Sequence, residues 1–211
     1  MVDFPVIPER MALITIDMQN CFVEGYPLSA PDGLVVLDRI NRLAEVCRET
    51  GMLVVHVREV LRSDGTNAGV FGEIHPFVKD GFFSRDSEAA ALHKGLVVDP
   101  GDILLEKPRY GAFHATDLEM VLRTHGIDTL IITGIATNVC CETTTREAMV
   151  RDFRVFFLSD GTATGGIGEV SAAELQKATL ATLGALFAQV LTVDEMIQKI
   201  RCAARTAPRA A

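Results

Sequence analysis

The chain has 211 residues, of which 48% are hydrophobic and 23% charged, as in a soluble globular protein with one core, so we expect a single domain over 1–203. Its formal net charge of −8 disfavours nucleic-acid binding, which relies on clustered Lys and Arg. We also expect no membrane partner and a cytoplasmic location. No apolar run nears the roughly 20 residues of a membrane span, no basic leader precedes the first strand, and the five cysteines show no C-x-x-C pair.

Short apolar segments alternate with helix-period segments along the chain. The expected strands are 12–17, 52–58, 102–106, 129–134, 154–159 and 186–191, and the expected helices are 34–49, 116–125, 139–151, 169–183 and 193–201. Most of the strand segments are continuously apolar, which is typical of parallel strands covered on both faces. The alternation predicts an α/β fold, a Rossmann-like three-layer α/β/α domain with a six-stranded, mainly parallel sheet.

Three further segments carry local signals. The glycine-rich segment 61–81 has the length of a lid or binding loop. Thr116 and Glu119 have the spacing of a capping box, which would start the helix at 116–125. Residues 204–211 are expected to form a flexible tail.

Three reactive side chains each follow a predicted strand: Asp17, Lys107 and Cys140. The carboxyl ends of parallel strands share one edge of the sheet, where ligands bind. Cys140 falls in the first turn of a predicted helix, where backbone N–H groups favour a thiolate and could hold an oxyanion. Asp17 could accept the thiol proton, and Lys107 could keep both neighbours ionised. Singly, each also fits an ordinary role: a buried inert Cys, a turn-capping Asp or a solvated Lys.

The neighbouring thiol of Cys141 competes with Cys140 for the role of nucleophile. It lies about 100° further round the helix, so the two side chains cannot face one pocket equally, but periodicity does not choose between them. A redox pair is a weaker hypothesis, because adjacent cysteines form only a strained disulfide.

Three motifs carry a family resemblance that runs from about Ala12 to Ala163. They are ITIDMQNCF, the run from Glu106 to Ala148 that contains GIATNVCCE, and FLSDGTAT. They resemble the isochorismatase-like cysteine hydrolases, a superfamily that holds nicotinamidases, N-carbamoylsarcosine amidases, ureidoacrylate amidohydrolases and biuret hydrolases. Lys107 to Leu118 is most similar to the ureidoacrylate and biuret branch.

The resemblance implies roles for individual residues. Asp17 would be the proton acceptor, Lys107 the assisting base, and Cys140 rather than Cys141 the nucleophile. The backbone N–H groups of Ala136 and Cys140 would form the oxyanion hole, beside a cis peptide bond between Ile135 and Ala136. The substrate-pocket candidates are Gln19, Arg58, Tyr110, Phe113 and His114, although ordinary packing explains Tyr110 and Phe113 as well.

The implied activity is that of a cysteine amidohydrolase. It would cleave the C–N bond of a small amide or ureido/carbamoyl compound through a thioester, with no cofactor. No catalytic metal is expected, because His56-Val57-Arg58 stands where nicotinamidases carry Asp-x-His. Family members commonly form dimers or tetramers, so we expect a homo-oligomer. The alternatives are a nicotinamidase-type or maleamate-type amidase and a catalytically silent interaction protein on the same scaffold.

Overall fold

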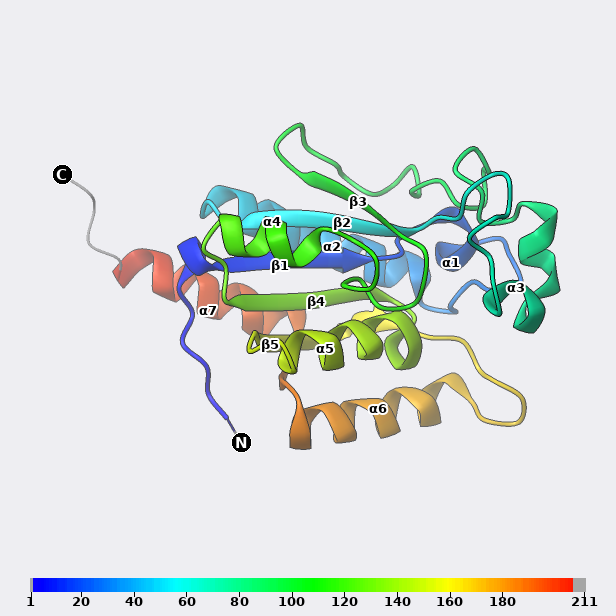
Figure 1. Cartoon of the computed structure of the whole chain (residues 1–211). Helices are drawn as coiled ribbons and strands as arrows, with labels where there is room; N and C mark the ends of the chain where they lie inside the picture. Colours follow the sequence, from blue (N-terminus) through cyan, green and yellow to red (C-terminus); the bar gives the residue numbers. More distant parts are fainter. Residues whose placement is uncertain (1, 207–211) are drawn as a thin grey trace.

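Six parallel strands form one sheet at the centre of the computed structural model, which describes residues 2–206 (Figure 1). Their spatial order is β3-β2-β1-β4-β5-β6. The strands are β1 (Met11–Ile16), β2 (Leu53–Glu59), β3 (Ile103–Lys107), β4 (Thr129–Ile135), β5 (Arg154–Ala163) and β6 (Gln189–Leu191). The predicted six-stranded α/β fold is confirmed, and every pairing between these strands is parallel.

Helices cover both faces of the sheet. In Figure 1, α4 (Leu118–Thr124), α5 (Glu142–Met149) and α6 (Ala172–Leu186) lie in front of it, and α2 (Gly33–Glu49) and α7 (Val193–Thr206) lie behind. Successive residues of a strand face opposite layers. Ile14 of β1 therefore joins the core under α4 and α5, whereas Leu13 packs in the core under α2 and α7. Every residue of β1 and β4 is buried, which explains their uninterrupted apolar sequence.

The helices α6 and α4 differ in how their first turns are capped. At α6 the Ser171 hydroxyl accepts from the N–H of Glu174, whose carboxylate accepts from the N–H of Ser171, forming a capping box. The capping box expected at Thr116 is wrong. The Thr116 hydroxyl instead donates to the carbonyl of Ala112 at 2.6 Å, and α4 begins only at Leu118.

A long connection between β2 and β3 lies against the carboxyl ends of the strands. We call residues 61–95 the covering segment. It contains the short helices α3 (Phe71–Ile74) and η2 (Pro76–Asp80). Its backbone bonds to the chain that follows β1: the N–H groups of 20 and 21 donate to the carbonyls of 91 and 89, and the N–H of 93 donates to the carbonyl of 18. The short helix α1 (Asn20–Val23) therefore lies between the sheet edge and this segment.

The chain ends also bear on the sequence expectations. At the amino-terminal side, η1 (Pro8–Arg10) precedes β1. The sequence predicts that the last helix ends at 201, whereas α7 continues to Thr206, so residues 204–206 of the expected tail are helical. The remainder of the expected tail, 207–211, lies outside the described residues. Within residues 2–206, no helix is long and apolar enough to cross a membrane.

Candidate active site

Four reactive side chains meet at the carboxyl edge of the sheet. Asp17 directly follows β1, Glu59 and Lys107 end β2 and β3, and Cys140 follows β4. The sheet order makes these four strands consecutive neighbours, and the chain reverses its winding direction at β1. In open α/β sheets, ligands bind in the crevice at such a reversal, outside the carboxyl ends of the strands.

The ends of β1 and β4 have backbone conformations that let the two strands lie unusually close together. Asp17 has a φ of +54°, in the left-handed region that few residues other than glycine adopt, and its N–H donates to the carbonyl of Val57 at 2.8 Å. Gly134 of β4 has a φ of +124°, and a Cβ on it would lie 2.0 Å from the carbonyl oxygen of Ile16. Only glycine therefore lets β4 pass β1 at this point.

The Lys107 ammonium lies in the middle of the group. Its Nζ is 2.8 Å from Asp17 Oδ2 and 3.7 Å from Cys140 Sγ, and all three side chains are buried. The ammonium of Lys107 and the carboxylate of Asp17 form a buried ion pair. The predicted convergence of Asp17, Lys107 and Cys140 is thus observed, while their catalytic roles remain predictions.

The fourth member, Glu59, was not among the site residues predicted from the sequence. Its side chain is 2% exposed; Oε2 lies 3.3 Å from Lys107 Nζ and accepts from Cys140 Sγ at 4.0 Å. Its other oxygen, Oε1, has no hydrogen-bond partner among the described residues. In sequence, a Glu beside Arg58 looks like a solvated strand end. Only the register of β2 and β3, which pairs Glu59 with Lys107, brings it to the site.

Burial and charge decide the protonation of the site. Burial raises the pKa of Asp17 to about 6, against the opposing effect of Lys107. Burial alone would lower the pKa of Lys107, but the charges of Asp17, Cys140 and Glu59 outweigh it and raise that pKa. Burial, reinforced by the two carboxylates, raises the pKa of Cys140 well above its usual value. The direction of this shift favours the thiol form of Cys140 and opposes the expected stabilisation of a thiolate by the start of the helix.

The nucleophile candidate sits in an irregular helical turn. The π-helical turn η3 (Thr137–Cys141) leads into α5, and the Cys141 N–H donates to the carbonyl of Ala136, five residues back, at 3.1 Å. Such turns often occur at functional sites. The thiol of Cys140 faces Lys107, whereas that of Cys141 lies 3.9 Å from the carbonyl of Thr133. The peptide bond between Ile135 and Ala136 is cis, as the family resemblance implied.

The donor atoms of Asp17, Glu59 and Cys140 lie within 4.8 Å of one another, close enough to share a metal ion. However, the Lys107 ammonium lies 2.8 Å from Asp17, 3.3 Å from Glu59 and 3.7 Å from Cys140. A metal bound by all three would have to sit about 2.0–2.3 Å from each ligand atom, in the space beside that cation. The set therefore fits a lysine ammonium better than a metal.

Two of the five pocket candidates are committed elsewhere. Gln19 donates to the carbonyls of Glu59 and Ala90 and accepts from the N–H of Glu59, so its amide holds the backbone under the site and is not free for substrate. Arg58 pairs with Glu106 at 2.6 Å. Because neighbouring residues of a strand face opposite sides, Arg58 points away from the face that carries Glu59.

The other three candidates lie at different depths. The Tyr110 ring packs against the buried cluster that contains Cys140. Burial, followed by the charges of Glu59 and Cys140, raises the pKa of Tyr110. Phe113 is buried and packs against Phe153 with ring centroids 5.7 Å apart, so ordinary packing accounts for it. His114 is exposed and lines a separate surface pocket.

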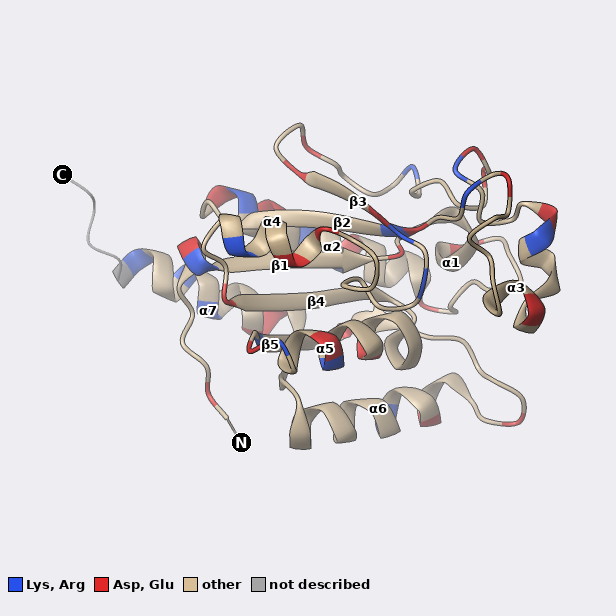
Figure 2. Ribbon diagram, viewed as in Figure 1, with Lys and Arg blue, Asp and Glu red and all other residues tan. Residues whose placement is uncertain are grey.

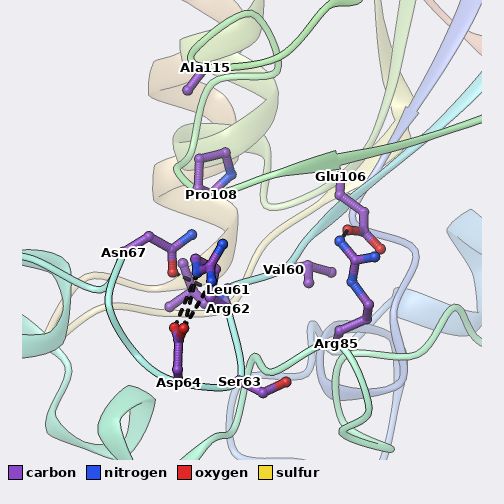
Figure 3. A pocket seen from close by; sticks show the side chains of 10 residues that line it. All are labelled: Val60, Leu61, Arg62, Ser63, Asp64, Asn67, Arg85, Glu106, Pro108 and Ala115. Atoms are coloured by element: carbon purple, nitrogen blue, oxygen red, sulfur yellow. Dashed lines mark hydrogen bonds and ion pairs between the residues drawn. The ribbon is translucent and has the colours of Figure 1, made fainter.

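The site is closed in this structure. Cys140 is 3% exposed, and the covering segment reaches over it where the Tyr110 hydroxyl meets His75 Nε2 at 2.9 Å. A cavity of about 550 Å³ lies next to the site, lined by residues that directly follow Glu59 and Lys107. Figure 3 shows the ion pair of Arg62 and Asp64 among its lining. None of the four reactive side chains is among the residues that line that cavity.

A family model described as the isochorismatase domain matches residues 11–195. The chain belongs to the isochorismatase family. This isochorismatase-family hydrolase is 36% identical over 187 residues to nicotinamidase 3 of Arabidopsis thaliana, covering 88% of this chain and 86% of the relative. It is 30% identical over 218 residues to a ureidoacrylate amidohydrolase of Klebsiella pneumoniae, covering 93% and 89%.

Solved structures support the same assignment. A cysteine hydrolase from Pseudomonas syringae superposes on the isochorismatase-family chain with a TM-score of 0.91 at 35% identity, covering 96% of this chain and 97% of that one. A family protein from Burkholderia thailandensis superposes with a TM-score of 0.81 at 30% identity, covering 94% and 100%. The sheet and its helical layers are therefore those of the family.

Proposed function

We propose that this isochorismatase-family hydrolase is a cysteine amidohydrolase that cleaves the C–N bond of a small amide or ureido compound. One observation carries the proposal: a buried thiol, Cys140, lies 3.7 Å from the ammonium of Lys107, which in turn pairs with Asp17 at 2.8 Å. A thiol, a proton acceptor and a fixed cation are the parts that acyl transfer through a thioester needs.

The proposed reaction has two stages. Asp17 accepts the thiol proton as Cys140 Sγ bonds to the carbonyl carbon, and the carbonyl electron pair moves to oxygen, held by the backbone N–H groups of Ala136 and Cys140. Collapse breaks the C–N bond, and Asp17 returns the proton to the leaving nitrogen. Asp17 then takes a proton from water, whose oxygen attacks the thioester carbon. The C–S bond breaks, and Asp17 returns the proton to the Cys140 sulfur. Lys107 stays positive throughout and stabilises the thiolate.

Two substrate branches have support. The similarity of Lys107 to Leu118 to ureidoacrylate and biuret hydrolases favours a ureido compound, as do the ureidoacrylate amidohydrolases at 30–33% identity. The nicotinamidase at 36% identity supports a nicotinamidase-type amidase as the second candidate. The two branches share the proposed thioester chemistry and differ in the acyl group.

Ammonia release from a substrate panel tests the proposal. The panel contains ureidoacrylate, biuret, N-carbamoyl amino acids, maleamate and nicotinamide, and the matched control is Cys140→Ala. We expect the wild-type protein to release ammonia from at least one ureido or amide compound and the control to release none. If the wild-type protein released no ammonia from any compound of the panel, that result would support a catalytically silent interaction protein.

A further inference from the structure

Glu59 is a buried carboxylate that the proposed reaction does not use. A carboxylate 2% exposed is costly unless charges and hydrogen bonds compensate for its lost hydration. The single cation of the group, Lys107, is already paired with Asp17 at the shorter distance of 2.8 Å, against 3.3 Å to Glu59. The site therefore carries one carboxylate more than its cation balances.

The two oxygens of Glu59 differ in their surroundings. Oε2 contacts Lys107 Nζ and accepts from the Cys140 thiol, whereas Oε1 has no hydrogen-bond partner within residues 2–206. Buried carboxylate oxygens normally accept hydrogen bonds. The backbone of Glu59 is fixed by both polar atoms of the Gln19 amide, at 2.7 and 3.0 Å, so the strand end is held rigidly. Oε1 is therefore an acceptor beside the nucleophile that is available to a donor on a bound ligand.

We propose that Glu59 accepts an N–H of the substrate and thereby selects ureido carbonyls, which carry nitrogen on both sides. The inference rests on the proposed amidohydrolase function. A carbonyl carbon about 3–3.5 Å from Cys140 Sγ is placed for attack. Glu59 Oε2 lies 4.0 Å from that sulfur, and the unpartnered Oε1 belongs to the same carboxylate, so a nitrogen attached to the carbon can reach this group at about 2.9 Å.

The arrangement of two carboxylates matches the shape of a ureido group. The donor atoms of Asp17, Glu59 and Cys140 lie within 4.8 Å of one another. With the carbonyl oxygen in the oxyanion hole, one substituent of the carbon faces Asp17 and leaves as ammonia, and the other faces Glu59. If that second substituent is NH, it donates to Glu59. If it is CH2, the buried carboxylate stays without a donor, which disfavours a simple carboxamide.

Matched substrates that differ only by NH or CH2 test the inference. The pairs are biuret with malonamide and 3-ureidopropionate with glutaramate, assayed by ammonia release. For at least one pair, we expect a wild-type kcat/KM about tenfold or more higher for the NH member. Glu59→Gln should reduce that preference about tenfold, because kcat/KM should fall about ten times more for the NH member than for the CH2 member. The control is Glu106→Gln on the adjacent strand, whose side chain pairs with Arg58 and Arg85, and it should keep the preference.

Each other outcome has a distinct meaning. An equal fall for both members in Glu59→Gln makes Glu59 a support for Lys107 only, which overturns the inference and leaves the amidohydrolase intact. A wild-type protein that hydrolyses the CH2 member as fast as the NH member in both pairs overturns it without any variant. Should Glu59→Gln fail to fold, Glu59→Asp keeps the charge on a shorter side chain and should also lower the preference. Absence of ammonia from every pair contradicts the amidohydrolase proposal itself.

Discussion

Asp17 gives the site its expected pH dependence. Its pKa is raised to about 6 because burial penalises the charged carboxylate. A general base works only when ionised, so kcat/KM should fall about tenfold per pH unit below 6 and level off above it. Asp17→Asn should lower kcat/KM about a hundredfold or more and remove this acid limb. Activity that stays constant between pH 4.5 and 7 in the wild-type protein would contradict the assignment of Asp17 as the base.

Lys107 should stabilise the fold as well as the thiolate. Lys107→Met leaves two buried carboxylates without a cation, and removing one partner of a buried ion pair costs about 3–5 kcal/mol. The pKa of Asp17, already raised in the folded protein, would rise further. A group with a raised folded pKa favours folding below its unfolded pKa of about 4 and loses that contribution as the pH rises through the folded value. The free energy of unfolding lost by the variant should therefore be larger at pH 7 than at pH 5, as measured by urea denaturation. A loss that does not depend on pH would contradict this account.

At the scale of elements, the pairing of β1 with β4 positions Asp17 against Cys140. Gly134→Ala puts a Cβ 2.0 Å from the carbonyl oxygen of Ile16, so the two strands must separate. We expect a loss of about 3 kcal/mol or more in unfolding free energy, and reduced activity because Asp17 follows Ile16. Gly25→Ala is the matched control: its φ is +78°, but no atom lies within 4 Å of an added Cβ, so only about 1 kcal/mol of backbone strain is expected. Equal effects of the two substitutions would show that close strand approach is unimportant.

Among the secondary-structure elements, the buried strands were easier to predict from the sequence than the helix caps. Continuous apolar runs predicted β1 and β4, because strands buried on both faces need them. Helix caps were less predictable. The spacing of Thr116 and Glu119 suggested a capping box, yet the Thr116 hydroxyl donates to the carbonyl of Ala112. The capping box at Ser171 was not predicted. Glu59 could not be predicted, since its place in the site depends on strand register rather than on its neighbours in sequence. Arg58 precedes Glu59 in β2 and faces the other side of the strand, where it pairs with Glu106.

The whole molecule presents a surface suited to self-association. Figure 2 shows that α6 carries few charged residues, and nearby apolar side chains are exposed: Val150 by 70% and Leu186 by 65%. Such exposed apolar area is typical of interfaces. We predict a homo-oligomer by light scattering at micromolar protein, and Leu186→Glu should shift it toward monomer. A wild-type mass near 22.9 kDa, that of one chain, would contradict the prediction.

The central claim is that Cys140 forms a covalent acyl intermediate, and mass spectrometry of protein quenched during turnover tests it most directly. The substrate is any compound that releases ammonia in the panel. Peptide mapping should find the acyl mass on Cys140 in the wild-type protein, and Cys140→Ala should show neither adduct nor turnover. The Cys141 thiol lies against Thr133 and not against Lys107. The variant Cys141→Val should therefore keep a turnover rate within about tenfold of the wild-type rate, a difference of about 1.4 kcal/mol in barrier. An adduct on Cys141, or full activity in Cys140→Ala, would contradict the account.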